Sequence, residues 1–287
     1  MRDFSNDHRW LSINTRTVDK QGDLPAIVDT LARLGIRGIS PWRHQVAAVG
    51  LDRAVKVIRD AGLELSGYCR GGMLTSDSAH ARDARDDNHR AIDEAAALAS
   101  PCLVMVVGAL PQFSRPGSTP SKDIGLARAQ VVDRLGKLLD HARAAKVPLG
   151  LEPLHPMYAA DRACMNTMRH ALDICDTLDP ARSGAIGLAL DVYHTWWDPE
   201  LEAQIKRAGK ERILAFHVCD WLVPTTDLLE DRGMMGDGVI DIPRVRALVE
   251  AQGFSGYCEV EIFSRNWWAQ PMEAVLKTCI DRYRMAV

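Results

Sequence analysis

Gly150-Leu151-Glu152-Pro153-Leu154 decides the fold, because this stretch places a carboxylate at the end of a short apolar strand. Three later apolar stretches end in the same way. They are Leu188-Ala189-Leu190-Asp191-Val192-Tyr193-His194, Ala215-Phe216-His217-Val218-Cys219-Asp220-Trp221 and Cys258-Glu259-Val260-Glu261-Ile262-Phe263. If consecutive parallel strands lie side by side, Glu152, Asp191, His217 and Glu261 converge on one point. Three carboxylates gather there only when a cation neutralises them, so the four residues predict a divalent-metal site.

Short apolar runs alternate with amphipathic segments along the whole chain. The expected strands are Trp10 to Asn14, Gly38 to Pro41, Glu64 to Cys69, Cys102 to Val107, Pro148 to Glu152, Ile186 to Asp191, Ile213 to Cys219 and Tyr257 to Phe263. Between them, apolar residues recur three or four positions apart, as on the buried face of a helix. Strand and helix repeated eight times predict an α/β fold, a single (β/α)8 TIM barrel over residues 1–287 with its site at the C-terminal face. The absence of a glycine-rich phosphate motif after the first strand makes a Rossmann domain the weaker choice.

Two helix starts and two long loops are also predicted. Asp52 is expected to cap the helix that runs to Ala61-Gly62, and Asp161 to open the helix that contains Met168. A loop at 111–120 follows the fourth strand and is long enough to act as a lid over the barrel mouth. A second polar loop, at 225–238, follows the seventh strand.

The composition disfavours several classes of protein. The formal net charge of -3 gives no electrostatic attraction to nucleic acid or to anionic membranes. The seven cysteines are scattered and contain no CxxC pair, which disfavours a disulfide framework and favours a reducing cytoplasm. The N-terminus lacks an apolar leader and no run of 18 apolar residues follows, so neither export nor a membrane span is expected. The sequence leaves open whether the chain forms a homo-oligomer.

The two-residue period of a strand decides which side chains share the inner face of the barrel. Glu152 points the same way as Gly150, Asp191 as Ala189, and His217 as Ala215 and Cys219. Glu261 shares a side with Glu259, which lies one layer deeper; we assign the metal to Glu261 and keep Glu259 as the alternative ligand. A site of three carboxylates and one imidazole favours Mn²⁺, with Mg²⁺, Co²⁺ or Zn²⁺ also compatible. Cys219 is interpreted as a small buried hydrophobic residue.

Several of these motifs together resemble the xylose-isomerase-like barrel superfamily of sugar isomerases and epimerases. They are the strand-end Glu152-Pro153, the Asp-x-x-His from Asp191 to His194, the His217 strand, the turn at 236–241 and the final Glu261-Ile262-Phe263. The resemblance covers residues 145–265 and is only architectural before that. It implies that Glu152, Asp191, His217 and Glu261 are the metal ligands and that Glu152 and Glu261 match the acid/base pair of the ketose 3-epimerases. It also implies that His194 and Arg232 hold substrate oxygens. The chain departs from the family pattern at His155 and Glu259, which puts the substrate in question more than the metal.

The chemistry follows from these parts. A divalent cation that binds two adjacent oxygens of a hydroxy-ketone stabilises the enediolate that forms when a carbon-bound proton leaves. Glu152 is expected to remove that proton, and Glu261 to return one to the opposite face. Arg232, Arg70 and Arg43 lie near loops at the barrel mouth, where they could bind sugar hydroxyls or a carboxylate; Arg232 ranks first.

Most of the tryptophans follow predicted strand ends, where their rings could stack on a sugar ring or an aglycone. They are Trp42, Trp196, Trp197, Trp221, Trp267 and Trp268. We expect Trp42 and Trp221 to bind substrate, although loop packing or a subunit contact is the simpler explanation for any single tryptophan. Together with the lack of a phosphate motif, these aromatic residues favour a neutral sugar or a glycoside.

The leading hypothesis is a divalent-metal-dependent isomerase or epimerase of a keto-sugar or related polyol. The alternative is a metal-dependent dehydratase or lyase acting on an inosose, a dehydroshikimate-like acid or a 3-keto-glycoside, with His155 as the acid that assists the leaving group. A nuclease of the abasic-site repair type shares the barrel but needs further histidines for a three-zinc cluster, and the early strand ends supply too few. A non-catalytic binding protein would have to keep four metal ligands without a reaction, which makes it a weaker hypothesis.

Overall fold

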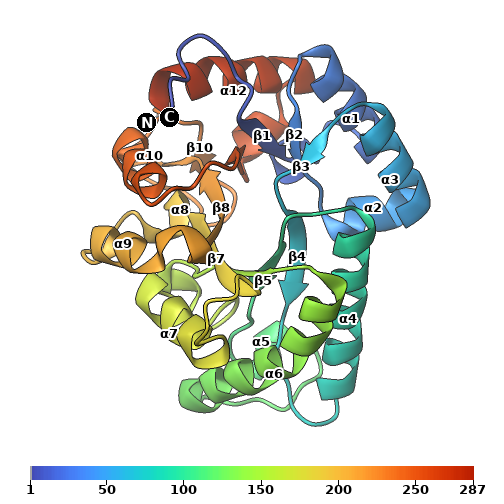
Figure 1. The fold of residues 1–287 in the computed structure, drawn as a ribbon, viewed down its shortest axis with the longest axis vertical. Coiled ribbons are helices and arrows are strands. Elements are labelled where there is room, and N and C mark those ends of the chain that lie inside the picture. The colour runs from blue at the N-terminus through green and yellow to red at the C-terminus, as the bar shows by residue number, and fades with distance from the viewer. Residues whose placement is uncertain (1) are drawn as a thin grey trace.

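A computed structural model describes residues 2–287, and its centre is a parallel sheet that curls into a nearly closed barrel (Figure 1). The order of its nine strands is β3-β2-β1-β11-β8-β7-β6-β5-β4. Their bounds are β1 Leu11–Asn14, β2 Gly38–Ser40, β3 Glu64–Leu65, β4 Tyr68–Gly72, β5 Leu103–Val106, β6 Leu149–Leu151, β7 Ile186–Asp191, β8 Ile213–Val218 and β11 Cys258–Val260. A parallel bridge between Trp42 and Cys69 joins β4 to the segment after β2 and brings the two ends of the sheet together. The predicted TIM barrel is confirmed.

One predicted strand, Glu64 to Cys69, is instead two short strands, β3 and β4. The break occurs because the backbone changes partners within it. The Ser66 N–H donates to Ile39 O, whereas the Tyr68 N–H donates to Cys102 O. The chain therefore begins to pair with β5 at this point, while the Cys69 N–H still donates to Pro41 O just beyond β2.

Helices surround the strands (Figure 1). The longer ones are α1 Leu24–Arg33, α2 Arg43–Val49, α3 Leu51–Asp60, α4 Ala81–Ala97, α6 Ile124–Ala145, α7 Met168–Leu178, α9 Leu201–Arg212, α10 Ile242–Ala251 and α12 Met272–Ala286. Short helical turns are η1 Thr15–Val18, α5 Pro111–Ser114, η2 Pro156–Tyr158, α8 Val192–Thr195 and α11 Arg265–Trp268. Each long helix buries an apolar stripe against the sheet; α6, for example, buries Val131, Leu135, Leu138 and Leu139. None of the helices within residues 2–287 combines the length and apolar character needed to cross a membrane.

The two predicted helix starts were wrong. Asp52 lies inside the first turn of α3, because the chain enters this helix through Gly50, whose φ of 86° suits glycine. Asp161 does not open α7, which begins at Met168 with the Thr167 side chain accepting from the His170 N–H. The residues after Asp161 are tied to other segments instead, since the Cys164 N–H donates to Gly108 O.

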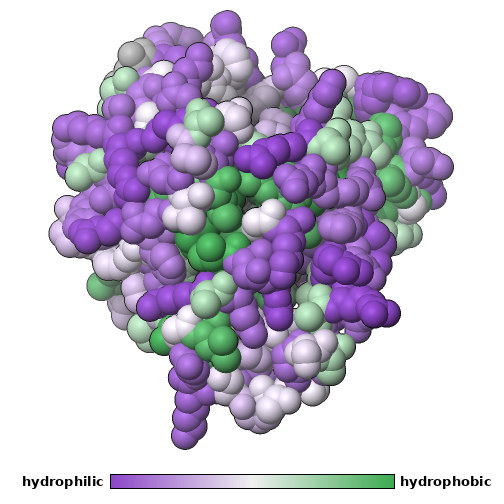
Figure 2. All heavy atoms as spheres, turned by 60° about the horizontal axis from the view of Figure 1, so that its bottom comes forward, coloured by the Kyte–Doolittle hydropathy of each residue, from purple (hydrophilic) through white to green (hydrophobic). Residues whose placement is uncertain are grey.

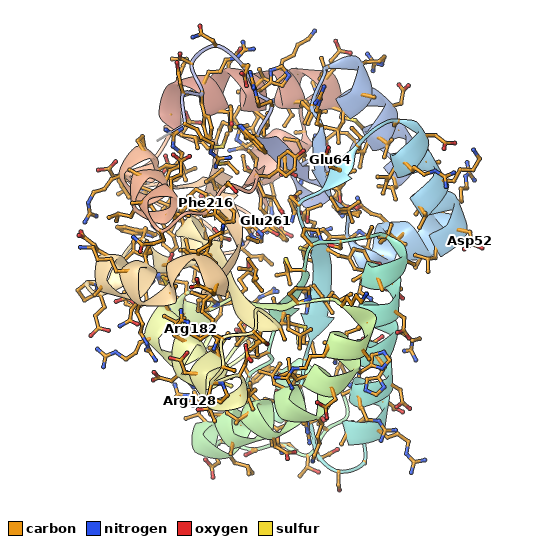
Figure 3. All side chains as sticks on the ribbon, in the orientation of Figure 1. Asp52, Glu64, Arg128, Arg182, Phe216 and Glu261 are labelled. Atoms are coloured by element: carbon orange, nitrogen blue, oxygen red, sulfur yellow. The ribbon has the colours of Figure 1, made fainter. Side chains whose placement is uncertain are left out.

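Small residues fill the inside of the barrel. Cys69, Cys102, Val104, Ala189 and Ala215 form a buried cluster separate from the larger core that packs between the sheet and the helices. Gly150 also faces the inside of the barrel, because a Cβ added to its Cα would contact Ala189 and Cys102. On β8, Phe216 lies on the outer side toward α10, whereas Glu261 lies near the middle of the strands (Figure 3). This alternation leaves the space above the small residues to polar side chains.

The two long loops that the sequence predicted, at 111–120 and 225–238, both follow strands of the barrel. Residues 111–120 include the helical turn α5, in which Ser114 Oγ accepts from the Ala109 N–H at 2.6 Å; the predicted lid role stays a prediction. Residues 225–238 include β10 (Arg232–Gly233), which pairs antiparallel with β9 (Asp220–Trp221). The Asp220 carboxylate accepts from three backbone N–H groups of residues 236, 238 and 240, so this second loop is anchored.

The outer surface is mostly polar on the face drawn in Figure 2, where hydrophobic side chains gather in a recessed area near the centre. All seven cysteines lie within the described residues, and each is buried and unpaired. The stability of the fold therefore depends on the apolar core and its polar contacts.

Candidate active site

Four side chains meet at the C-terminal ends of neighbouring strands. Glu152 follows β6, Asp191 ends β7, His217 lies near the end of β8 and Glu261 follows β11. Each offers one ligand atom, and these atoms lie within 4.8 Å of one another. All four side chains are buried. The structure thus brings together the residues that the sequence predicted to converge.

His217 occupies the middle of this cluster. Its Nδ1 lies 3.2 Å from Glu152 Oε1 and 3.7 Å from Glu261 Oε2. Its Nε2 lies 3.5 Å from Glu259 Oε1, without the geometry of a hydrogen bond. The Nδ1 atom is therefore the one that faces the other predicted ligands.

Glu259 points away from the cluster, into the deeper layer of the barrel. Its carboxylate accepts from Ser66 Oγ at 2.7 Å and from Asn14 Nδ2 at 2.8 Å. Asn14 Nδ2 also donates to Glu261 Oε1 at 3.0 Å. The geometry favours Glu261 over Glu259 as the ligand, and it adds Asn14 as a residue that holds both glutamates.

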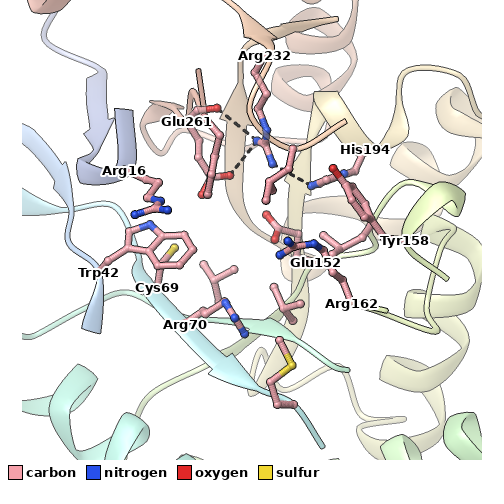
Figure 4. Close-up of a pocket in the computed structure, with 16 residues that line it drawn as sticks. Arg16, Trp42, Cys69, Arg70, Glu152, Tyr158, Arg162, His194, Arg232 and Glu261 are labelled. Atoms are coloured by element: carbon pink, nitrogen blue, oxygen red, sulfur yellow. Dashed lines mark hydrogen bonds and ion pairs between the residues drawn. The ribbon is translucent and has the colours of Figure 1, made fainter. Parts of the chain in front are cut away.

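Arg232 is the cation that contacts the cluster directly (Figure 4). Its Nη1 lies 3.0 Å from Asp191 Oδ2 and 3.2 Å from Glu261 Oε2, and its Nη2 lies 3.2 Å from His194 Nε2. The Arg232 side chain is itself buried. The Arg232 guanidinium therefore contacts two of the three carboxylates. The third carboxylate, Glu152, contacts His217 instead.

Burial and charge shift the pKa values of these groups in different directions. Burial raises the pKa of Glu152, and it raises the pKa of Asp191 to about 7. Burial would also raise the pKa of Glu261, but His217 and Arg232 outweigh it and the pKa ends below its ordinary value. Burial would lower the pKa of His217, but Glu259 and Glu152 raise it well above its usual range. The cluster holds more negative charge than its own cations balance.

The arrangement fits a divalent cation. Metal–ligand bonds of about 2.0 to 2.6 Å place opposite ligand atoms roughly 4 to 5 Å apart. The four ligand atoms lie within that spacing. Three carboxylates and one imidazole nitrogen are donors that Mn²⁺, Mg²⁺, Co²⁺ and Zn²⁺ accept, so the donor set does not select among them.

Adding Mn²⁺ to metal-free protein should raise the melting temperature, because a cation relieves the repulsion among the buried carboxylates. At a free metal concentration of 100 times the Kd, binding stabilises a protein by about 2.7 kcal/mol. In a chain of this size that corresponds to a shift on the order of 5 °C. Thermal unfolding with and without metal measures it. Asp191→Asn should lose most of the shift, and an undiminished shift in that variant would mean that the ion binds elsewhere.

A cavity of about 250 Å³ opens beside the cluster (Figure 4). Its lining includes six predicted site residues, Glu152, Glu261, His194, Arg232, Trp42 and Arg70. Its volume lies just below the usual range for pockets that bind drug-sized ligands, so it suits a molecule about as large as one sugar ring. Among residues 2–287, Trp42 is the only tryptophan on its wall.

His155 and Trp221 do not line this cavity. Their rings stack on each other with centroids 4.8 Å apart, and Trp221 packs equally closely on Tyr193. The His155 N–H donates to His194 Nδ1 at 3.1 Å. Both residues are partly exposed and lie outside the cavity lining, where His155 supports His194 and Trp221 packs against His155.

Arg43 does not reach the cavity either. Its guanidinium forms ion pairs with Asp87 and Glu94, at 3.0 and 2.8 Å. These partners lie on α4 and draw the side chain outward. The remaining predicted arginine, Arg70, stays on the wall.

The arginines and aromatic residues of the wall that were not predicted are Arg16, Tyr158, Arg162 and Phe263. Phe263 could have been predicted from the sequence, because it lies two residues after Glu261 and the two-residue period of a strand places both side chains on one side. Tyr158 and Arg162 lie in the irregular segment after β6, where no regular period predicts the direction of a side chain. Arg16 lies in η1, just past β1.

Comparisons with known proteins agree with this geometry. A family model described as xylose isomerase-like TIM barrel matches residues 28–283. An inosose isomerase of Bacillus subtilis strain 168 is 28% identical over 150 residues, 51% of each chain. The chain thus spans about half the length of the curated relatives it matches.

Two solved structures are similar over nearly the whole chain. A protein of Sinorhizobium meliloti 1021 is 54% identical, with a TM-score of 0.91 over 96% of this chain and 98% of that one. The IOLI protein with a bound zinc atom is 19% identical, with a TM-score of 0.78 over 96% of this chain and 99% of that one. At this identity the second likeness concerns the fold alone.

Proposed function

Because the chain belongs to the xylose isomerase-like TIM barrel family, we propose that it is a divalent-metal-dependent isomerase or epimerase of a keto-sugar or related polyol. One observation carries the proposal. Glu152 and Glu261 come from different strands and line the same small cavity (Figure 4). Two carboxylates that face one bound molecule are what proton transfer between two faces of a carbon requires.

The proposed reaction removes one proton from carbon and returns another. In one direction Glu152 takes a proton from the carbon next to the carbonyl, and the electron pair of that C–H bond forms the enediolate of the substrate. Glu261 then donates a proton to the opposite face of the same carbon, which epimerises it, or to the neighbouring carbon, in which case the proton of the substrate hydroxyl also moves to the former carbonyl oxygen. In the reverse direction the two glutamates exchange roles. One glutamate must start ionised and the other protonated; the lowered pKa of Glu261 and the raised pKa of Glu152 suit the reverse direction, in which Glu261 takes the proton and Glu152 returns one.

Glu152, Asp191, His217 and Glu261 would hold the metal. When bound, a divalent cation would polarise the carbonyl and stabilise the negative charge that develops on its oxygen. His194 and Arg232 lie beside the cluster on the cavity wall and can hydrogen-bond substrate oxygens. Burial lowers the pKa of His194, which keeps its imidazole neutral.

Two relatives support the substrate class and the metal. The Bacillus subtilis protein is described as an inosose isomerase, and inosose is a cyclic keto-polyol. The IOLI structure contains zinc, so this fold can hold a divalent ion. We keep Mn²⁺ as the preferred metal and Zn²⁺ as the first alternative to test.

The test is to incubate metal-loaded protein with keto-sugars and inososes in deuterated water. We expect one solvent deuterium on the carbon next to the carbonyl, in a product whose formula is otherwise unchanged. Loss of water or of an aglycone would instead support the lyase alternative. His155, the candidate acid for that alternative, does not line the cavity, which favours isomerisation. Failure of every compound to exchange would contradict the proposal.

A further inference from the structure

Two arginine side chains on the cavity wall lack an anionic partner within residues 2–287. Arg70 lies on β4 and Arg162 follows η2, and both line the cavity (Figure 4). The two other arginines on the wall are paired: Arg232 with Asp191 and Glu261, and Arg16 with Asp19. Arg70 and Arg162 form neither an ion pair nor a side-chain hydrogen bond with any described residue.

Aromatic rings hold both unpaired side chains. The Arg70 guanidinium carbon lies 6.0 Å from the centroid of the Trp42 ring, and the Arg162 guanidinium carbon lies 5.6 Å from that of Tyr158. Both rings also line the cavity. A ring that contacts a guanidinium by its face steadies the cation but accepts few of its five N–H donors. The donors therefore remain available to a ligand in the cavity.

The charge of the cavity indicates what that ligand carries. Arg232 and a divalent cation together balance the three carboxylates of the cluster when His217 is neutral. The deeper carboxylate of Glu259 offsets one of the two positive charges of Arg70 and Arg162, so a net positive charge remains beside a partly enclosed space. Both side chains are only partly exposed, and burial lowers the pKa of Arg70. A bound anion would compensate these charges.

We propose that Arg70 and Arg162 form an anion subsite, and that the substrate carries a carboxylate or phosphate group as well as its hydroxy-ketone. The substrate class rests on the proposed function; the subsite rests on the two arginines alone. The hydroxy-ketone lies between Glu152 and Glu261, and the anionic end lies against the guanidinium groups. Arginine suits this role because its planar fork donates two parallel hydrogen bonds to a carboxylate or a phosphate. The proposal replaces the neutral sugar expected from the sequence.

Calorimetry on the Mn²⁺-loaded protein can test the subsite with matched sets of ligands. Each set contains a ketohexose, the same sugar oxidised to a carboxylate at C6, and its 6-phosphate, such as D-fructose, D-fructuronate and D-fructose 6-phosphate. D-tagatose and D-psicose give two further sets. We expect at least one anionic member to bind on the order of 10-fold more tightly than its neutral counterpart, through charge-assisted hydrogen bonds. Which member it is distinguishes a carboxylate from a phosphate.

Arginine variants then show whether Arg70 and Arg162 cause the preference. The double variant Arg70→Gln/Arg162→Gln should bind the anionic and neutral members about equally, whereas Arg53→Gln on the exposed side of α3 should keep the wild-type preference. If the double variant does not fold, Arg70→Lys and Arg162→Lys retain the charge but not the fork, and each should weaken the preference.

Three results would overturn the subsite. They are equal binding within every matched set, no binding of any anionic member, and a preference that survives in the arginine variants. Deuterium exchange into neutral ketoses without any anion preference would contradict the subsite and leave the proposed function intact. An anion preference without deuterium exchange in any compound would contradict the proposed function and leave the subsite intact.

Discussion

Replacing Glu152 or Glu261 with glutamine should reduce kcat on the order of 10³-fold while the chain keeps its fold. The expected loss reflects proton transfer, because an amide of the same shape cannot exchange a proton with carbon and positioned acids and bases contribute about 10² to 10⁴ in rate. Both side chains lie above the barrel core, which consists of small apolar residues that neither glutamate supports. Rates should be measured with the compound that shows deuterium exchange, in each variant and in the wild type.

Metal content decides how this result is interpreted. Each glutamate is also a proposed ligand, so the rates should be compared only at metal concentrations that saturate the variant. Glu273→Gln on α12, whose side chain pairs with Arg33 and Lys277 outside the cavity, is the matched control and should keep full activity. Normal turnover in either metal-loaded cavity variant would rule out the two-glutamate mechanism.

The parts of the site that the sequence predicted are those that strands position. A strand fixes the direction of every second side chain, and parallel neighbours fix which strand ends are adjacent. For this reason Glu152, Asp191, His217 and Glu261 could be placed together from four short apolar runs. The same rule placed Glu259 on the same side as Glu261 but one layer deeper, where its carboxylate accepts from Asn14 and Ser66.

Residues in irregular segments could not be placed in this way. Trp221 follows a strand end, as the sequence indicated, but it belongs to β9 and its ring packs between His155 and Tyr193 instead of facing the cavity. Arg162 does face the cavity, yet nothing in the irregular segment after β6 distinguishes it from a surface arginine. Their positions depend on pairings across the fold, such as β9 with β10, that have no local signature.

Asn14 illustrates a different limit. It is the last residue of the first strand, so its place at the C-terminal edge could be predicted. Its role could not, because an amide becomes part of the site only through partners far away in the chain. Asn14 Nδ2 reaches both Glu259 and Glu261, and its Oδ1 accepts from Trp42 Nε1 at 2.7 Å. A carboxylate cluster is visible in a sequence because its charges repel, whereas a neutral residue that holds it in place leaves no such signal.

Replacing Arg232 with methionine should lower the unfolding free energy of the metal-free protein by about 3 to 5 kcal/mol, because it leaves two buried carboxylates without their cation. Arg232 is the guanidinium that contacts both Asp191 and Glu261. Denaturant unfolding of the metal-free variant and wild type measures the loss. Arg265→Met removes exposed ion pairs to Asp227 and Glu230 and should leave stability unchanged.

Repeating the unfolding at saturating Mn²⁺ turns this stability measurement into a test of where the metal binds. A cation held by Asp191 and Glu261 supplies the positive charge that the Arg232→Met variant has lost. Metal should therefore stabilise the variant more than it stabilises the wild type, and the difference between the two proteins should shrink. An equal difference with and without Mn²⁺ would mean that the ion and Arg232 act on separate carboxylates, and the four-residue metal site would have to be abandoned.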